Sequence, residues 1–129
     1  MDFVVDTHAL FWYLTDDSRL GSEASSVFEQ AESGSAFIHI PSIVIAELYF
    51  IVRKFNAAID FGPQFVILES ASQFILTPFD AEDVLDFDRD SVINEMHDRI
   101  IVGVARRLDA PLLTRDRNIV ESNLVKVVW

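Results

Sequence analysis

Cysteine is absent from this 129-residue chain. Its absence excludes disulfide bonds and thiolate metal sites, and it is compatible with a reducing compartment. Long apolar runs are also missing. The longest, residues 36–46, contains His39, Pro41 and Ser42, so no segment reaches the roughly 18 apolar residues that a membrane span needs. The chain starts with an acidic residue and a short apolar run, unlike a signal peptide. We therefore expect a cytoplasmic protein without a membrane segment.

Basic residues are scarce: ten Lys and Arg stand against 21 Asp and Glu, for a net charge of −11. This balance excludes a long basic groove for nucleic acid. Seven of the ten basic residues lie from Arg89 onward, and bound cations would cancel part of the acidic charge, so a short nucleic-acid contact is still allowed. Half of the residues are hydrophobic and eleven are Phe, which predicts an apolar surface that meets a partner.

Short apolar runs alternate with helical patterns along what we expect to be one domain, residues 1–129. The expected strands are residues 3–5, 37–40, 74–77, 112–114 and 124–129. The expected helices are residues 8–14, 22–32, 41–55, 65–72, 81–87 and about 98–108, with a break at 56–63. This alternation predicts an α/β fold: a mostly parallel twisted sheet of four to five strands, flanked by helices on both faces.

Four acidic residues fall at the ends of expected strands or in the first two turns of expected helices: Asp6, Glu47, Asp98 and Asp116. Ligands of parallel sheets bind outside the carboxyl ends of the strands, so these side chains are expected to gather there. Two unit charges ~4 Å apart repel by roughly 4 kcal/mol at an effective dielectric near 20, so such a cluster would bind cations or protons. Carboxylate oxygens suit Mg²⁺ or Mn²⁺, and such ions can activate water against a phosphodiester.

Each of these acids also has a simpler interpretation. Asp6 can merely cap the helix that follows it. Asp98 can sit near a helix start because the helix dipole favours negative charge there. Glu47 can lie on a solvated helix edge, and Asp116 can form a turn with the residues after it. Residue pattern alone leaves these alternatives open.

Other side chains are suited to nucleic-acid contact. Three arginines can grip phosphates, although solvated or salt-bridged arginine is as common a role: Arg99, Arg115 and Arg117. Several aromatic side chains can stack on bases, but such residues more often lie in a core or a protein interface: Trp12, Tyr13, Tyr49, Phe50 and Phe55. The three histidines, His8, His39 and His97, lack an obvious ligand spacing, and His97 is the better candidate for substrate contact.

Four segments carry these residues in order: 4–12 (VVDTHALFW), 42–48 (SIVIAEL), 97–105 (HDRIIVGVA) and 113–117 (LTRDR). Together they resemble the motifs of PIN-domain proteins, particularly the VapC-type ribonuclease toxins of bacterial toxin–antitoxin pairs. The resemblance spans nearly the whole chain. One departure concerns residues 95–99 (EMHDR), where many relatives have Asp-Pro-Phe-Asp-Arg. It retains Asp98 and Arg99 and leaves the role of Glu95 open.

The resemblance implies an endoribonuclease that uses Mg²⁺ or Mn²⁺. Asp6, Glu47 and Asp98 would form the acidic core, and Asp116 would complete it directly or through water. Thr7 and Thr114 would support the site with their hydroxyl groups. The implied partners are an RNA substrate, a cognate protein antitoxin and, usually, a second copy in a homodimer. The aromatic-rich residues 48–65 are the expected antitoxin surface, since such partners often dock as apolar helices.

Three other functions compete with this one. A catalytically silent PIN-like interaction module would not need all four acids. A phosphoacceptor receiver domain needs an early acidic pair and a late Lys at a strand end, whereas Asp6 is single and Lys126 lies inside the expected last strand. A phosphatase with a nucleophilic Asp usually has a second Asp two residues on, and His8 occupies that position here.

Overall fold

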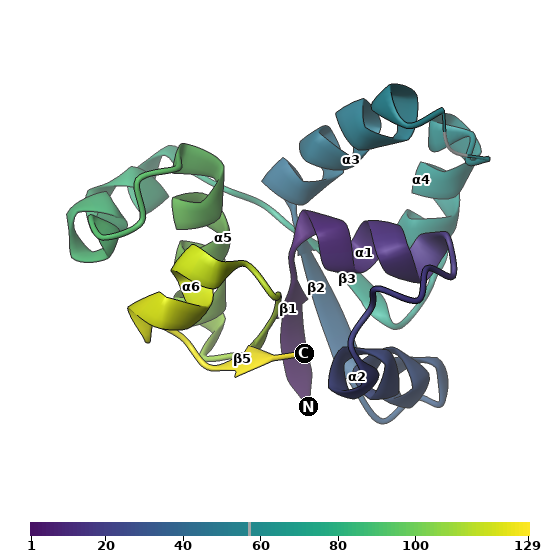
Figure 1. Cartoon of the computed structure of the whole chain (residues 1–129), viewed down its shortest axis with the longest axis horizontal. Helices are drawn as coiled ribbons and strands as arrows, with labels where there is room; N and C mark the ends of the chain where they lie inside the picture. Colours follow the sequence, from purple (N-terminus) through teal and green to yellow (C-terminus); the bar gives the residue numbers. More distant parts are fainter. Residues whose placement is uncertain (57) are drawn as a thin grey trace.

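Five parallel strands form one sheet in the order β3-β2-β1-β4-β5. The computed structural model shown in Figure 1 describes residues 1–56 and 58–129. The strands are β1 (Asp2–Val5), β2 (Phe37–Pro41), β3 (Phe74–Thr77), β4 (Leu112–Leu113) and β5 (Val127–Val128). The α/β class and the parallel sheet expected from the sequence are confirmed.

The direction in which strands are added reverses beside β1. The chain places β2 and then β3 on one side of β1, and later returns to place β4 and β5 on the other side. Val5 of β1 is in register with Leu113 of β4, so the residues that follow them, Asp6 and Thr114, leave the sheet at the same edge. Such a reversal opens a crevice outside the carboxyl ends of the strands, where α/β proteins bind ligands.

Helices flank this sheet, with α5 and α6 on the left of β1 in Figure 1 and α1 to α4 on the right. They are α1 (Thr7–Leu14), α2 (Ser22–Glu32), α3 (Ser42–Lys54), α4 (Phe61–Ser70), the 3₁₀-helix η1 (Ala81–Asp90), α5 (Met96–Leu108) and α6 (Arg117–Ser122). The core between the layers includes the fully buried Val4, Ile38 and Leu112 of the three central strands. None of the described helices is both long and apolar enough to cross a bilayer.

Two helix starts differ from the sequence-based expectation. Helix α4 begins at Phe61 rather than residue 65, because Pro63 falls in its first turn, where the missing N–H of proline costs no intrahelical hydrogen bond. The expected break at 56–63 is therefore shorter, and Ala57 within it lies outside the described residues. Helix α5 begins at Met96 rather than at Asp98, because the Glu95 carboxylate accepts a hydrogen bond from the Asp98 N–H at 2.8 Å and caps the helix.

The end of the chain also differs from expectation. Only Val127–Val128 pair with the sheet, so the expected strand at 124–129 was too long. Before it lies α6, which was not predicted. Asp116 caps its start by accepting from the Ile119 N–H at 3.1 Å, and Asn123 ends it with a left-handed φ of 55°. The segment expected as a helix at 81–87 is instead the longer 3₁₀-helix η1.

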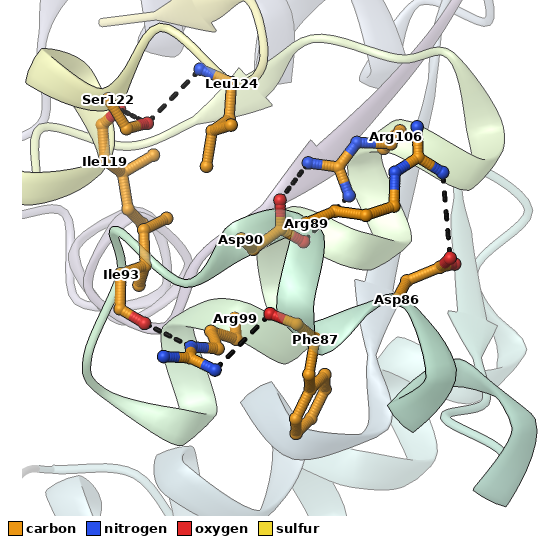
Figure 2. Close-up of polar contacts among 10 residues, drawn as sticks. All are labelled: Asp86, Phe87, Arg89, Asp90, Ile93, Arg99, Arg106, Ile119, Ser122 and Leu124. Atoms are coloured by element: carbon orange, nitrogen blue, oxygen red, sulfur yellow. Dashed lines mark hydrogen bonds and ion pairs between the residues drawn. The ribbon is translucent and has the colours of Figure 1, made fainter.

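An ion pair and a cluster of carbonyl contacts join η1 to α5 (Figure 2). Asp90 is 1% exposed and receives two hydrogen bonds from the Arg106 guanidinium, one of them 2.7 Å from Nη1 to Oδ2. Arg99 donates to the backbone carbonyls of Ile93, Phe87 and Ser91. These contacts hold the η1–α5 connection, and with it the first turn of α5 that carries Asp98.

Candidate functional site

A cleft of about 760 Å³ lies at the reversal point of the sheet. All four acidic residues singled out in the sequence line it: Asp6, Glu47, Asp98 and Asp116. They arrive from different elements. Asp6 directly follows β1, Glu47 lies in the second turn of α3, Asp98 lies in the first turn of α5, and Asp116 lies between β4 and α6. Glu95 and Thr7 also line the cleft, so its floor is rich in carboxylate oxygens.

Asp6 is the most buried of these acids, with 9% of its surface exposed. Its Oδ1 accepts a hydrogen bond from the Ala9 N–H at 2.9 Å, so it does cap α1, as the simpler interpretation holds. Burial raises the pKa of Asp6, while hydrogen bonds with the Thr114 side chain and the Ala9 N–H act to lower it. Asp6 is thus fixed in place and shielded from water while it faces the cleft.

Two threonine hydroxyls connect the acids to one another. Thr7 Oγ1 donates to Glu47 Oε1 at 2.7 Å, joining the start of α1 to α3. Thr114 is fully buried, its Oγ1 accepts from the Asp116 N–H at 3.0 Å, and its side chain helps to lower the pKa of Asp6. These contacts hold acids that are far apart in the sequence in one arrangement.

Three helices point their N-termini toward this cleft, because the residues that cap them line it. Asp6 caps α1, Glu95 caps α5 and Asp116 caps α6. The partial positive charge at a helix N-terminus stabilises nearby anions, typically by about 0.3–1 kcal/mol each. The helix N-termini therefore offset part of the repulsion among the carboxylates in the cleft. Capping and membership of the acidic cluster are compatible roles for the same side chain.

The charges in the cleft are close enough to influence one another. Partial burial, and then the charges of Asp116, Glu95, Glu47 and Asp6, raise the pKa of Asp98 to about 7. Every other acid of the floor thus contributes to the raised pKa of Asp98. No three Asp, Glu or His side chains within residues 1–56 and 58–129 are grouped tightly enough to hold a metal ion as they stand.

His97 lies beside these acids rather than among the lining residues. Its Nδ1 is 3.3 Å from Glu47 Oε2 and 3.6 Å from Glu95 Oε1. The imidazole therefore contacts Glu47 through the carboxylate oxygen that Thr7 does not use. His39 lies elsewhere, between Thr77 and Asp2 across strands β2, β3 and β1.

The three arginines singled out in the sequence have different surroundings. Only Arg115 lines the cleft. Arg99 is turned toward backbone carbonyls of the η1–α5 connection (Figure 2), and Arg117 pairs with Glu121 at 2.8 Å on the exposed side of α6. Arg19 and Trp129 line the cleft although sequence reasoning did not select them. No local pattern marks them, since the loop after α1 and the chain beyond β5 bring them there.

Comparison with known proteins identifies the family of this chain. Residues 3–122 match the family model of the PIN domain, and no curated protein matches the chain significantly. The fold is similar to a crystal structure of VapBC2 from Rickettsia felis bound to a promoter DNA fragment, with a TM-score of 0.66, 18% identity, and coverage of 98% of this chain and 97% of that chain. It is also similar to FitAB bound to an IR36 DNA fragment, with a TM-score of 0.64, 15% identity, and coverage of 98% and 93%. This chain belongs to the PIN-domain family.

Proposed function

We propose that this protein is a metal-dependent endoribonuclease that acts as a VapC-type toxin and is held inactive by a cognate antitoxin. PIN domains are generally nucleases, which supports a hydrolase of phosphodiester bonds. The likeness of the fold to VapBC2 and FitAB supports a toxin–antitoxin context. RNA as the substrate and a homodimer as the working form follow from the sequence resemblance, and the cytoplasm as the compartment follows from the composition; all three are part of this proposal.

One observation carries the proposal: four acidic side chains from four separate elements line one cleft at the reversal point of a parallel sheet. Gathering carboxylates costs free energy, as the raised pKa of Asp98 illustrates. A fold needs such an arrangement only where it binds cations or protons. A silent interaction module gains nothing from it.

The donor set fits a hard divalent cation, because carboxylate and hydroxyl oxygens are the preferred ligands of Mg²⁺ and Mn²⁺. Asp6, Glu47 and Asp98 would hold the ion, with Asp116 joining directly or through water. The bound ion would supply the positive charge that activates water and stabilises the departing oxygen of a phosphodiester. Asp98 is only partly buried, so its side chain can rotate toward an ion shared with Asp6 and Glu47, which are held by hydrogen bonds.

The protein's own residues supply orientation. Thr7 restrains Glu47 through Oε1 while His97 contacts Oε2, so both carboxylate oxygens are positioned by neighbours. Thr114 does the same for Asp6 and for the backbone of Asp116. Loss of such supporting contacts typically lowers metal affinity or activity by about 10- to 100-fold.

The direct test is cleavage of a labelled single-stranded RNA by the purified protein with Mg²⁺ or Mn²⁺, with EDTA, and with the cation restored in excess. We expect cleavage only when a divalent cation is present, because the acidic floor of the cleft would hold the ion that activates water against the phosphodiester. Cleavage that is unaffected by EDTA would contradict the proposal. The proposal would also be contradicted if a mixed pool of cellular transcripts stayed intact with Mg²⁺, with Mn²⁺ and with EDTA.

The antitoxin surface in this proposal is the aromatic face of α3 and α4. Its exposed side chains are Tyr49, Phe50, Phe55, Val66 and Ile67. The ring of Tyr49 contacts both Phe50 and Phe61 edge-on at 5.2 and 5.4 Å, which joins the two helices into one surface. Phe55, at the end of α3, has its ring 6.3 Å from that of Phe11 in α1 and lines the cleft, so an apolar helix docked along α3 would reach the acidic site.

Replacing Phe50 by Ser is expected to weaken antitoxin binding by about 10- to 100-fold, because a side chain that is 68% exposed loses little in the free protein and much in the complex. RNA cleavage by the free protein should be unchanged. The measurement is isothermal titration with the protein encoded beside this gene, with Val120→Ser on α6 as the matched control. Equal affinity of Phe50→Ser and the unaltered protein would place the antitoxin on another face.

A further inference from the structure

One wall of the cleft is aromatic and cationic rather than acidic. We call it the arginine wall and define it by Trp12, Arg19, Arg115 and Trp129, all of which line the cleft. The guanidinium carbon of Arg115 lies 4.4 Å from the centroid of the Trp12 ring and 5.9 Å from that of Trp129. The guanidinium carbon of Arg19 lies 5.0 Å from the Trp12 ring. Such distances allow cation–π attraction for each pair.

The two arginines of this wall differ in how their charge is compensated. Arg19 is paired with Asp17 through Nη2–Oδ2 at 2.8 Å and Nε–Oδ1 at 3.0 Å. These hydrogen bonds lower the pKa of Asp17 to about 2, so the pair is charged on both sides at neutral pH. Arg115 forms no ion pair with any carboxylate in the described part of the chain. Its charge helps to lower the pKa of the nearby Asp17, but no ion pair in the described residues occupies its guanidinium, so that group can bind a ligand.

The guanidinium of the exposed Arg115 lies against two packed indole rings. Trp12 is 4% exposed and forms a rigid base. Trp129 packs edge-on against Trp12, with centroids 5.7 Å apart and planes at 70°. Gly21 permits this packing, since a Cβ there would lie 2.5 Å from the carbonyl carbon and the ring Cδ1 of Trp129. A guanidinium held beside two indole rings loses less conformational entropy when it binds a ligand than a free side chain does.

We propose that Arg115, positioned by Trp12 and Trp129, binds a backbone phosphate of single-stranded RNA next to the phosphate that is cleaved. The inference rests on the proposed function. Arg115 lies between Thr114 and Asp116, so the cation and the acidic floor share one short segment after β4. A guanidinium matches the geometry of a phosphate. In a chain of net charge −11, a polyanion needs such a local contact to enter an acidic cleft.

The test measures binding and cleavage of one short labelled single-stranded RNA. Binding is measured by fluorescence anisotropy in an Asp98→Asn background, which keeps the RNA intact, at several salt concentrations. Arg115→Ala is expected to reduce the slope of log K against log[salt] by ~0.7, the value for one lost phosphate contact on a single strand. In the otherwise unaltered enzyme it should raise KM about tenfold and change kcat by less than about threefold, because the contact exists before and during the reaction.

Matched variants separate this role from a structural one. Arg117→Ala removes the same charge two residues away, outside the cleft, and should change neither the slope nor KM. Arg115→Lys should keep the slope and lose affinity severalfold, because the charge remains without the planar group. Trp129→Leu should weaken RNA binding when residue 115 is Arg, but it should have no further effect in the Arg115→Lys protein. This is the result expected if Trp129 acts through the guanidinium of Arg115.

Two results would overturn the inference while leaving the proposed function intact. In the first, the protein cleaves RNA, but Arg115→Ala changes the salt slope and KM no more than Arg117→Ala does. In the second, Arg115→Ala reduces the salt slope with RNA but not with single-stranded DNA of the same sequence. The second would assign the contact to the ribose, because both polymers carry the same phosphates and the same base sequence. Conversely, RNA binding that depends on Arg115 in a protein without nuclease activity would support the inference and contradict the proposed function.

Discussion

Replacing Asp98 by Asn is expected to reduce RNA cleavage by about 10²–10³-fold or more, as is typical when a group that stabilises developing charge is removed. Asp98 is the residue on which the charges of Asp6, Glu47, Glu95 and Asp116 converge. Asparagine keeps the shape of the side chain but removes one negative charge from the set that would hold the cation. Single-turnover cleavage with Mg²⁺ and with Mn²⁺ measures the effect, and Asp6→Asn should behave in the same way.

The control is Asp88→Asn, which removes an equal charge from an exposed position of η1 outside the cleft. It should cleave RNA at the rate of the unaltered protein. Equal cleavage by Asp98→Asn and the unaltered protein would indicate a contaminating nuclease. With the contaminant removed, absence of cleavage in both proteins would favour the silent interaction module.

Asp98→Asn should also be more stable than the unaltered protein in EDTA at pH 8, which separates lost chemistry from lost folding. The pKa of Asp98 is raised from 3.8 to about 7, so the folded protein holds that proton more tightly than the unfolded chain does. The free energy of unfolding therefore falls as pH rises from about 4 to 7, and the loss is complete above 7. Asparagine does not titrate, so the Asp98→Asn protein does not lose this part of its free energy of unfolding. We expect a gain of about 1 kcal/mol at pH 8, modest because Asp98 is partly exposed, and no gain near pH 4.

Replacing Arg106 by Leu is expected to lower the free energy of unfolding by about 3–5 kcal/mol, because it leaves the Asp90 carboxylate buried without a partner. Figure 2 shows the guanidinium of Arg106 directed at that carboxylate. The loss is a large fraction of the about 5–15 kcal/mol by which a typical domain is stable. Urea denaturation followed by circular dichroism measures it.

The matched control is Arg107→Leu, one residue further along α5. Arg107 pairs with Asp83 at 2.8 Å, but both side chains are partly exposed, at 40% and 25%. Its loss should cost about 1 kcal/mol or less. The double replacement Asp90→Leu with Arg106→Leu should recover most of the stability, since no unpaired charge remains. Equal costs for the two arginine variants would mean that burial of Asp90 does not dominate the energetics of the η1–α5 connection.

Local chemistry explains which parts of the fold were predictable. The apolar run at residues 3–5 favours a strand, and an acid that closely follows a strand of a parallel sheet lies near its carboxyl edge, as Asp6 does directly after β1 and Asp116 does three residues after β4. The predicted ends of helices were wrong where a capping residue, and not the apolar pattern, set the end of the helix. Glu95 starts α5 early, and Asp116 with Asn123 delimits a helix of only six residues, too short for its apolar periodicity to be recognised.

By itself the sequence determined the class of fold and the acids that belong at the carboxyl edge, because strand propensity, alternation and capping are properties of neighbouring residues. Tertiary structure alone decided which arginine faces those acids. Arg99, Arg115 and Arg117 have similar local settings, yet one binds carbonyls, one lies against Trp12 and Trp129, and one pairs with Glu121. The physical reason is that a long flexible side chain takes its direction from partners distant in the chain, and only folding brings those partners within reach.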